Sequence, residues 1–337
     1  MTAKYTFNIP SLEVGDILLS RGEGTGASLI AKHTDGHFSH AMVNVGNSVI
    51  HAMPDGVYSK NPQRLLFDSS DDIRVLRVRG GLTSQQKINI ERIARAWVGA
   101  LYSKSEAIAV VVRKLRKPNN SQKQFCSRLV AQCYQEAGIQ IVPNTDYCSP
   151  NDLALSQMLH AIPDSVVEAS ETEIKFANEK IDYNIKIQRC TFTWLAKARA
   201  LAKRRGLGEI ARQSDVGKLI FENPSLDKVI CNYIRSSGYL DYVDVDRSIN
   251  PFRYDKALFL EKFPTEAELR HAIAVEQDVN ATEIERHGYN YQVAKSNLGV
   301  LNNEYHRLVF LHAASLLGEV QVRVGVLNEV ENALTGR

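Results

Sequence analysis

The chain has 337 residues, an apolar fraction of 44% and a formal net charge of +3. This length is sufficient for two domains with separate hydrophobic cores, and the small net charge gives no argument for nucleic-acid binding. The five cysteines are odd in number and lack paired Cys-x-x-Cys ligands, which argues against a disulfide framework or a zinc finger and indicates a reducing compartment.

The N-terminus does not have the features of a secretory signal. Residues 1–10 lack a continuous apolar stretch and a small-residue cleavage site. The best apolar run, residues 107–112, is far too short to cross a bilayer. We therefore expect a cytoplasmic protein with no signal peptide and no transmembrane segment.

Short β-branched segments dominate the first part of the chain. Residues 17–20, 41–45, 48–52 and 73–79 are predicted strands, separated by turn residues such as Gly46-Asn47. Their length and spacing predict one antiparallel sheet.

Helical patterns accompany these strands. Residues 27–33 predict a short helix, and residues 83–99 predict a longer one that Ser84 caps. Residues 124–138 place apolar side chains at helical spacing. Cys126 then lies in the first turn of this last helix.

The pattern becomes mostly helical after Asp152. The helical segments, separated by glycines and prolines, are residues 168–182, 186–205, 215–221, 225–236, 265–280 and 291–334. We predict an α+β domain over residues 1–160 and a mostly α-helical domain over residues 161–337. The second domain would act as a cover, a partner surface or the interface of a homo-oligomer.

Two segments contain residues suited to covalent chemistry: Phe38-Ser39-His40 and, much later, Phe125-Cys126-Ser127. A helix N-terminus carries partial positive charge, which favours the thiolate form of Cys126. His40 opens an apolar strand, and an imidazole near the sulfur can take and return its proton. The alternative interpretations are a small buried cysteine and a surface histidine at the start of a strand.

Six fragments occur in an order that resembles the YiiX/YebB-like branch of the NlpC-type cysteine hydrolases. They are Gly15-Asp16-Ile17, Ser39-His40, His51-Ala52, Ala100-Leu101-Tyr102, Phe125-Cys126-Ser127 and Ser149-Pro150-Asn151-Asp152. This branch resembles papain with its halves circularly permuted, so that the histidine precedes the cysteine. Lecithin:retinol acyltransferase is a more distant relative. The resemblance covers about the first 160 residues.

The resemblance implies a catalytic triad. Cys126 would be the nucleophile and His40 the general base and acid. His51, on the next predicted strand, would orient the His40 ring and fix its tautomer. Many members of the branch carry glutamate at this third position, so His51 is a departure that weakens the electrostatic support of an imidazolium.

Three further positions match the family fragments. Ser39 and Asp16 would support the site, and Tyr102 would contact the substrate or donate a hydrogen bond. For Asp16, the alternative is a carboxylate that caps a turn.

A metal site is an alternative to this interpretation. His33, His37 and His40 have the spacing of ligands on one helix face, but Gly36 within a turn signal would break such a helix. We expect neither a metal nor a cofactor.

Two basic stretches, residues 113–117 and 197–205, are most simply solvated helix faces. Peripheral contact with an anionic membrane, or binding of an acidic substrate, is the alternative for the first. Aromatic residues that would stack on bases are not interleaved with either stretch, so we expect no nucleic acid.

We therefore predict a cysteine hydrolase that cleaves an amide bond in a small peptide-like or acyl-containing substrate through an acyl-enzyme. The resemblance leaves open an acyltransferase or lipid hydrolase, because both start from the same acyl-enzyme. A non-catalytic binding or scaffold protein is the third alternative.

Overall fold

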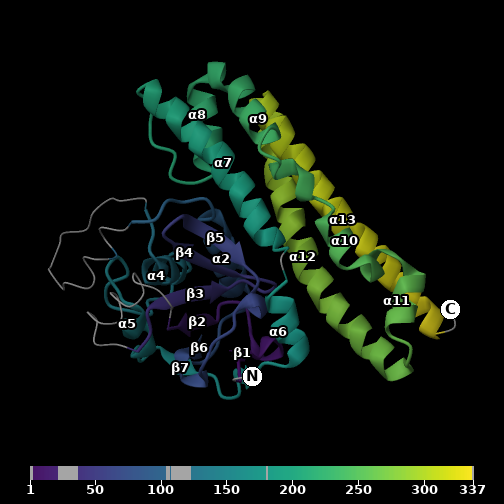
Figure 1. Ribbon diagram of the computed structural model, residues 1–337. Helices are drawn as coiled ribbons and strands as arrows, with labels where there is room; N and C mark the ends of the chain where they lie inside the picture. Colours follow the sequence, from purple (N-terminus) through teal and green to yellow (C-terminus); the bar gives the residue numbers. More distant parts are fainter. Residues whose placement is uncertain (1–2, 22–36, 104–106, 108–122, 180, 336–337) are drawn as a thin grey trace. The chain divides into compact units, whose positions relative to one another are not determined.

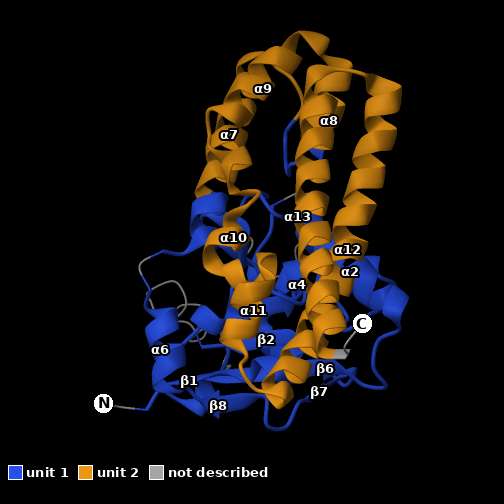
Figure 2. Cartoon of the chain, turned by 90° about the vertical axis from the view of Figure 1, so that its right-hand side faces the viewer, with its two compact units in different colours: residues 1–188, 209–215 blue, residues 189–208, 216–337 orange. Residues whose placement is uncertain are grey.

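The computed structural model describes residues 3–21, 37–103, 107, 123–179 and 181–335 (Figure 1). The chain forms two compact units, which Figure 2 colours separately. Unit 1 comprises residues 1–188 and 209–215, and unit 2 comprises residues 189–208 and 216–337. The expected helix at residues 27–33 and the basic stretch at residues 113–117 lie outside the described residues.

Unit 1 contains the antiparallel sheet predicted from the sequence. Its strand order is β5-β4-β3-β2-β6-β7, and every neighbouring pair is antiparallel. The strands are β2 (Ile17–Ser20), β3 (His40–Asn44), β4 (Val49–Met53), β5 (Gly56–Lys60), β6 (Ile73–Val78) and β7 (Leu159–Ala161).

Alternation along the central strands builds two cores. Ile17 and Leu19 of β2 belong to the core that also includes Leu129 of helix α4 (Cys126–Glu136). Leu18 faces the opposite side, where it packs in a second core with Phe7. Because successive strand residues point to opposite faces, one short strand serves both cores.

Helix α2 (Ser84–Ala96) covers the sheet together with α4, and the two helices pack against each other. Thr83, not Ser84, is the N-cap of α2: its hydroxyl accepts a hydrogen bond from the backbone N–H of Gln86, whose side chain accepts one from the backbone of Thr83. This reciprocal capping box needs an acceptor side chain three residues after the cap, and Gln86 supplies it.

Unit 1 extends beyond the boundary expected at residue 160. Strand β8 (Val166–Glu168) pairs with β1 (Tyr5–Phe7) at the start of the chain. Further on, the backbone oxygens of Glu179 and Ile181, beyond helix α6 (Glu171–Ala177), accept hydrogen bonds from Arg64. Residues 161–188 therefore belong to the same compact unit as the sheet.

Unit 2 is helical, as expected. Helix α7 (Tyr183–Arg204) begins in unit 1 and continues into unit 2. The other helices of unit 2 are α8 (Asp215–Glu222), α9 (Asp227–Arg235), α10 (Val245–Ile249), α11 (Lys256–Lys262), α12 (Glu266–Leu301) and α13 (Glu304–Thr335).

The prediction of one helix over residues 291–334 was wrong. Asn302 adopts a left-handed conformation with φ of 35°, which ends α12. The side-chain oxygen of Asn303 then accepts a hydrogen bond from the backbone N–H of His306 in the first turn of α13. Asparagine adopts the left-handed conformation and caps helix N-termini more readily than most residues. The Asn302-Asn303 pair therefore divides the segment into two helices.

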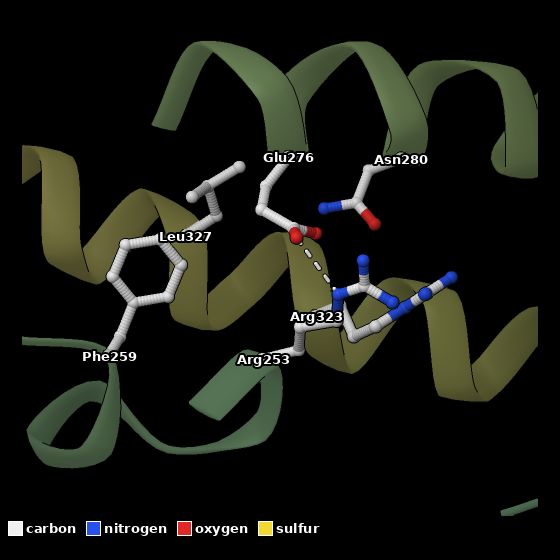
Figure 3. A pocket seen from close by; sticks show the side chains of 6 residues that line it. All are labelled: Arg253, Phe259, Glu276, Asn280, Arg323 and Leu327. Carbon is white, nitrogen blue, oxygen red and sulfur yellow. Dashed lines mark hydrogen bonds and ion pairs between the residues drawn. The ribbon is translucent and has the colours of Figure 1, made fainter. Parts of the chain in front are cut away.

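Side chains from α11, α12, α13 and the turn before α11 line a small pocket that contains both charged and apolar groups (Figure 3). Arg253 Nε lies 2.9 Å from Glu276 Oε1, and its Nη1 lies 3.1 Å from Asp246 Oδ1. Arg323 reaches the same aspartate and also pairs with Glu283. Opposite charges thus offset one another in a region where isolated ions would be costly.

Helix α13 bears on the expectation that the chain has no transmembrane segment. Its segment Glu304–Leu334 has 31 residues and contains an 18-residue window with a mean hydropathy of 1.2. It is the one helix in the described part of the chain that is long and apolar enough to cross a membrane. No continuous apolar run marks this helix in the sequence, because polar residues interrupt its apolar positions. Length and composition of a single helix are weak evidence for a membrane span.

Candidate active site

Cys126 lies where the first turn of α4 meets the start of β3. Its Sγ is 4.0 Å from the backbone oxygen of Ser39, and the side chain is 5% exposed. Backbone hydrogen bonds from Ala41 and Ser127 also reach the sulfur. Ser39 and Ala41 flank His40 at the start of β3, so the structure brings the cysteine to the strand position that carries this histidine.

His40 and His51 are hydrogen-bonded to each other. The Nε2 of His40 lies 2.9 Å from the Nδ1 of His51, and the ring centroids are 5.2 Å apart. The other side of the His51 ring packs edge-on against Tyr58, with centroids 4.5 Å apart. The Nε2 of His51 is buried and has no hydrogen-bond partner.

Burial keeps both histidines neutral. It lowers the pKa of His40 to about 4, with a smaller contribution from the positive charge of Lys60. Burial also lowers the pKa of His51, as do the charges of His40 and Lys60. Near neutral pH, the two rings therefore form a pair of neutral imidazoles.

Burial also decides the resting state of the cysteine. It raises the pKa of Cys126, although backbone N–H groups that include those of Ala41 and Ser127 oppose the shift. The helix start therefore favours the thiolate, as the sequence suggested, but does not make it the resting form. Desolvation of the anion exceeds the stabilisation that the first turn supplies.

Tyr102 lies near the nucleophile helix. It forms an isolated parallel bridge with Gln124, two residues before Cys126. Burial raises the pKa of Tyr102, and the charge of a Cys126 thiolate raises it further. The phenol is thus a neutral hydrogen-bond donor within electrostatic range of the sulfur.

Asp16 makes structural contacts. Its two carboxylate oxygens accept hydrogen bonds from Nε and Nη2 of Arg77 at 2.7 and 2.8 Å. One of them also accepts a hydrogen bond from the backbone N–H of Glu13, which closes a turn. The carboxylate therefore ties the start of β2 to β6, as the turn-capping interpretation had it.

Two further side chains build this region: Arg128, which no sequence motif singled out, and Asn151, which was named only as part of the Ser149–Asp152 fragment and without a role. Arg128, in the first turn of α4, is 1% exposed; its Nε donates to the backbone oxygen of Asp146 at 3.0 Å, and its guanidinium lies 4.9 Å from the ring centre of Phe125. Asn151 hydrogen-bonds the backbone of Phe38. An arginine inside an otherwise apolar helix pattern was the one signal available for Arg128.

The three histidines weighed as metal ligands do not share a helix. His40 lies in β3, and the Nε2 of His37 is 2.5 Å from the backbone oxygen of Asp71. His33 lies outside the described residues. Within the described ranges, no group of three histidine, cysteine or acidic side chains is arranged to hold a metal ion.

In this domain a central strand of the antiparallel sheet, which carries a histidine, comes before the helix that starts with a cysteine. This order defines a papain-like domain with its halves permuted. Residues 11–172 match a family model described as permuted papain-like amidase enzyme, YaeF/YiiX, C92 family, and this domain belongs to that family. The resemblance found in the sequence is thereby confirmed, as is the α+β fold class.

One solved structure with similarity to the chain is the crystal structure of metalloprotein yiiX from Escherichia coli O157:H7. It is 17% identical, the match covers 44% of this chain and 96% of that one, and the TM-score is 0.30. A search of curated proteins found no match. Residues 173–337, which include all of unit 2, lie outside the matched family model.

Proposed function

We propose that the protein is a cysteine amidase that cleaves a peptide-like amide through an acyl-enzyme on Cys126. The family supports amidase chemistry in general, and one observation supports these particular residues. Cys126 Sγ contacts the backbone on both sides of His40, while the His40 ring is hydrogen-bonded to His51. These contacts support Cys126 as the nucleophile, His40 as the base and His51 as the residue that orients the base.

The proton moves only when the substrate is attacked. At rest the site holds a thiol and a neutral imidazole, because burial raises the pKa of Cys126 and lowers that of His40. With its proton on Nε2, bonded to His51, His40 has a lone pair on Nδ1 to take the thiol proton. The sulfur bonds to the carbonyl carbon, and His40 later delivers the proton to the leaving amine.

The tetrahedral intermediate carries negative charge on the former carbonyl oxygen. We assign its stabilisation to the first turn of α4, whose N–H groups point toward the helix start, and to the neutral hydroxyl of Tyr102. Water then attacks the acyl-enzyme and releases the acid. Transfer to another acceptor would begin from the same intermediate, so the acceptor distinguishes a hydrolase from an acyltransferase.

The test is acylation by p-nitrophenyl acetate, with release of nitrophenolate as the rate and mass spectrometry as the locator of the acetyl group. We expect one acetyl group on Cys126, and we expect Cys126→Ala and His40→Ala to reduce the rate at least a hundredfold. Cys133→Ser is the matched control, because Cys133 is buried on the same helix. Acetylation of Cys133 or Cys148 in the parent would contradict the proposal.

A further inference from the structure

Asn151 clamps the chain two residues before His40. Its Oδ1 accepts a hydrogen bond from the backbone N–H of Phe38 at 3.2 Å, and its Nδ2 donates to the backbone oxygen of Phe38 at 3.1 Å. Phe38 is 2% exposed. One amide group therefore pairs both polar groups of a buried residue, as a neighbouring strand would.

The segment that carries Asn151 is also fixed to the nucleophile helix. Ser127 Oγ donates to the backbone oxygen of Cys148 at 2.7 Å, and Cys148 Sγ donates to the backbone oxygen of Ser127 at 3.3 Å. Ser127 follows Cys126 directly in α4. The loop is thus held to the first turn of that helix at two points.

The backbone between Cys148 and Asn151, which joins these two attachment points, has little conformational freedom. Ser149 is the N-cap of helix α5 (Pro150–Ala154), and its backbone N–H donates to Asp152 Oδ2 at 2.7 Å while its hydroxyl accepts from the backbone N–H of Asp152. This capping box, with Pro150 at the first helical position, fixes the backbone between Cys148 and Asn151.

We propose that Asn151 is a positioning residue that sets the distance between the Cys126 sulfur and the His40 imidazole. It joins the start of β3 to the first turn of α4 through a rigid bridge of four residues, Cys148 to Asn151. This role explains the Ser-Pro-Asn-Asp fragment, and it rests on the proposed function of Cys126 and His40. An error of about 1 Å in such a distance costs up to a hundredfold in rate.

Two substitutions at Asn151 separate the two hydrogen bonds. Asn151→Ala removes both and leaves the buried polar groups of Phe38 without a partner. Asn151→Asp keeps the size and the acceptor but places a carboxylate oxygen against the Phe38 carbonyl oxygen. Asn8→Ala is the matched control, because Asn8 Nδ2 makes a comparable long-range bond, 2.8 Å to the backbone oxygen of Asp164, in the same unit.

The experiment measures acylation of the full chain by p-nitrophenyl acetate from pH 5 to 9, together with amide hydrogen exchange at Phe38. We expect Asn151→Ala and Asn151→Asp to lower the limiting acylation rate at least tenfold. The ester concentration at half-maximal rate should stay within twofold, and exchange at Phe38 should accelerate. Asn8→Ala should leave all three within twofold of the parent.

Two outcomes distinguish this proposal from the proposed function. A cooperatively melting Asn151 variant with the parent's rate and pH profile would overturn the positioning role, while dependence on His40 in the parent would still support the triad. A parent whose rate does not depend on His40 would overturn the function itself. Because Asn151→Asp is isosteric, it decides the matter if Asn151→Ala does not fold.

Discussion

His51 meets His40 through its Nδ1, 2.9 Å from the His40 Nε2, while its own Nε2 is buried without a hydrogen-bond partner. In a triad with a carboxylate at this place, the negative charge would hold a proton on the base. Here the third residue is a second imidazole, which supplies no such charge. Burial, with a smaller contribution from the charge of Lys60, lowers the pKa of His40 to about 4. The pair orients the base without charging it.

Substitution of His51 should reveal this difference. A carboxylate in His51→Glu would stabilise the His40 imidazolium, so we expect the apparent pKa of the base to rise by about one unit or more. Acylation by p-nitrophenyl acetate at pH 7 should be retained or increased. In His51→Ala the His40 ring loses its partner, and the rate should fall at least tenfold.

The control for this pair is His37→Glu, which makes the same chemical change at an exposed histidine. It should leave the pH profile of acylation unchanged. Equal rates for His51→Ala and the parent would show that another residue orients His40.

Acid should destabilise unit 1 through the same histidines. Their pKa values are lowered on folding, so below pH 6.5 the unfolded chain binds protons that the folded chain does not. Their contribution to stability is complete above pH 6.5 and is lost as the pH falls through about 4. Each histidine contributes a slope of up to about 1.4 kcal/mol per pH unit.

The measurement is urea unfolding at pH 7, 6 and 5. Trp97 reports on unit 1 when Trp194 of unit 2 is replaced by phenylalanine. We expect His40→Gln to reduce the pH dependence of the free energy of unfolding by about 1 kcal/mol per unit below pH 6, and the exposed control His271→Gln to leave it unchanged. An unchanged slope in His40→Gln would mean that His40 is protonated equally in both states.

The sequence predicted the order of the reactive residues and the antiparallel sheet, because both depend on local patterns. The partner of Asp16 could not be predicted, since Arg77 lies 61 residues away and only folding brings it close. For the same reason the pairing of β1 with β8 was missed, and with it the extent of unit 1. The neutral resting state of Cys126 depends on burial, which the position of the residue in its helix does not reveal.

The buried ion network of unit 2 should be costly to break. Arg323 is 5% exposed and pairs with Glu283, and the charges of Arg323 and Arg286 hold the pKa of Glu283 low although burial would raise it. Glu283→Gln leaves Arg323 with less compensation. We expect a loss of about 2 to 4 kcal/mol in the free energy of unfolding of unit 2.

An exposed pair in the same helix serves as the control. Glu266 and Arg270 are 68% and 60% exposed and lie 2.7 Å apart, so Glu266→Gln should cost less than about 0.5 kcal/mol. Urea unfolding followed by Trp194 in a Trp97→Phe background measures both. Equal losses for the two variants would show that solvent reaches the Glu283 pair as freely as the surface one.

Shortening the chain tests where the catalytic unit ends. A chain that stops at Ala161 lacks β8, whose pairing covers β1, and it lacks the carbonyl groups of Glu179 and Ile181 that Arg64 binds. A chain that stops at Gln188 keeps both. We therefore expect the longer fragment to melt cooperatively, and the shorter one to melt several degrees lower or not to fold.

The longer fragment still lacks residues 209–215, which belong to unit 1. Within them, the Arg212 guanidinium lies 4.2 Å from the ring centre of Trp97, and Gln213 Nε2 donates to the backbone oxygen of Val98 at 3.4 Å. The segment also contains the buried residues Ile210 and Ala211. It is short, so its loss should lower the melting temperature without removing the fold. Acylation of Cys126 by p-nitrophenyl acetate should stay within threefold of the full chain. If the fragment ending at Gln188 melts cooperatively but its Cys126 does not react, residues beyond Gln188, either 209–215 of unit 1 or residues of unit 2, supply part of the active site.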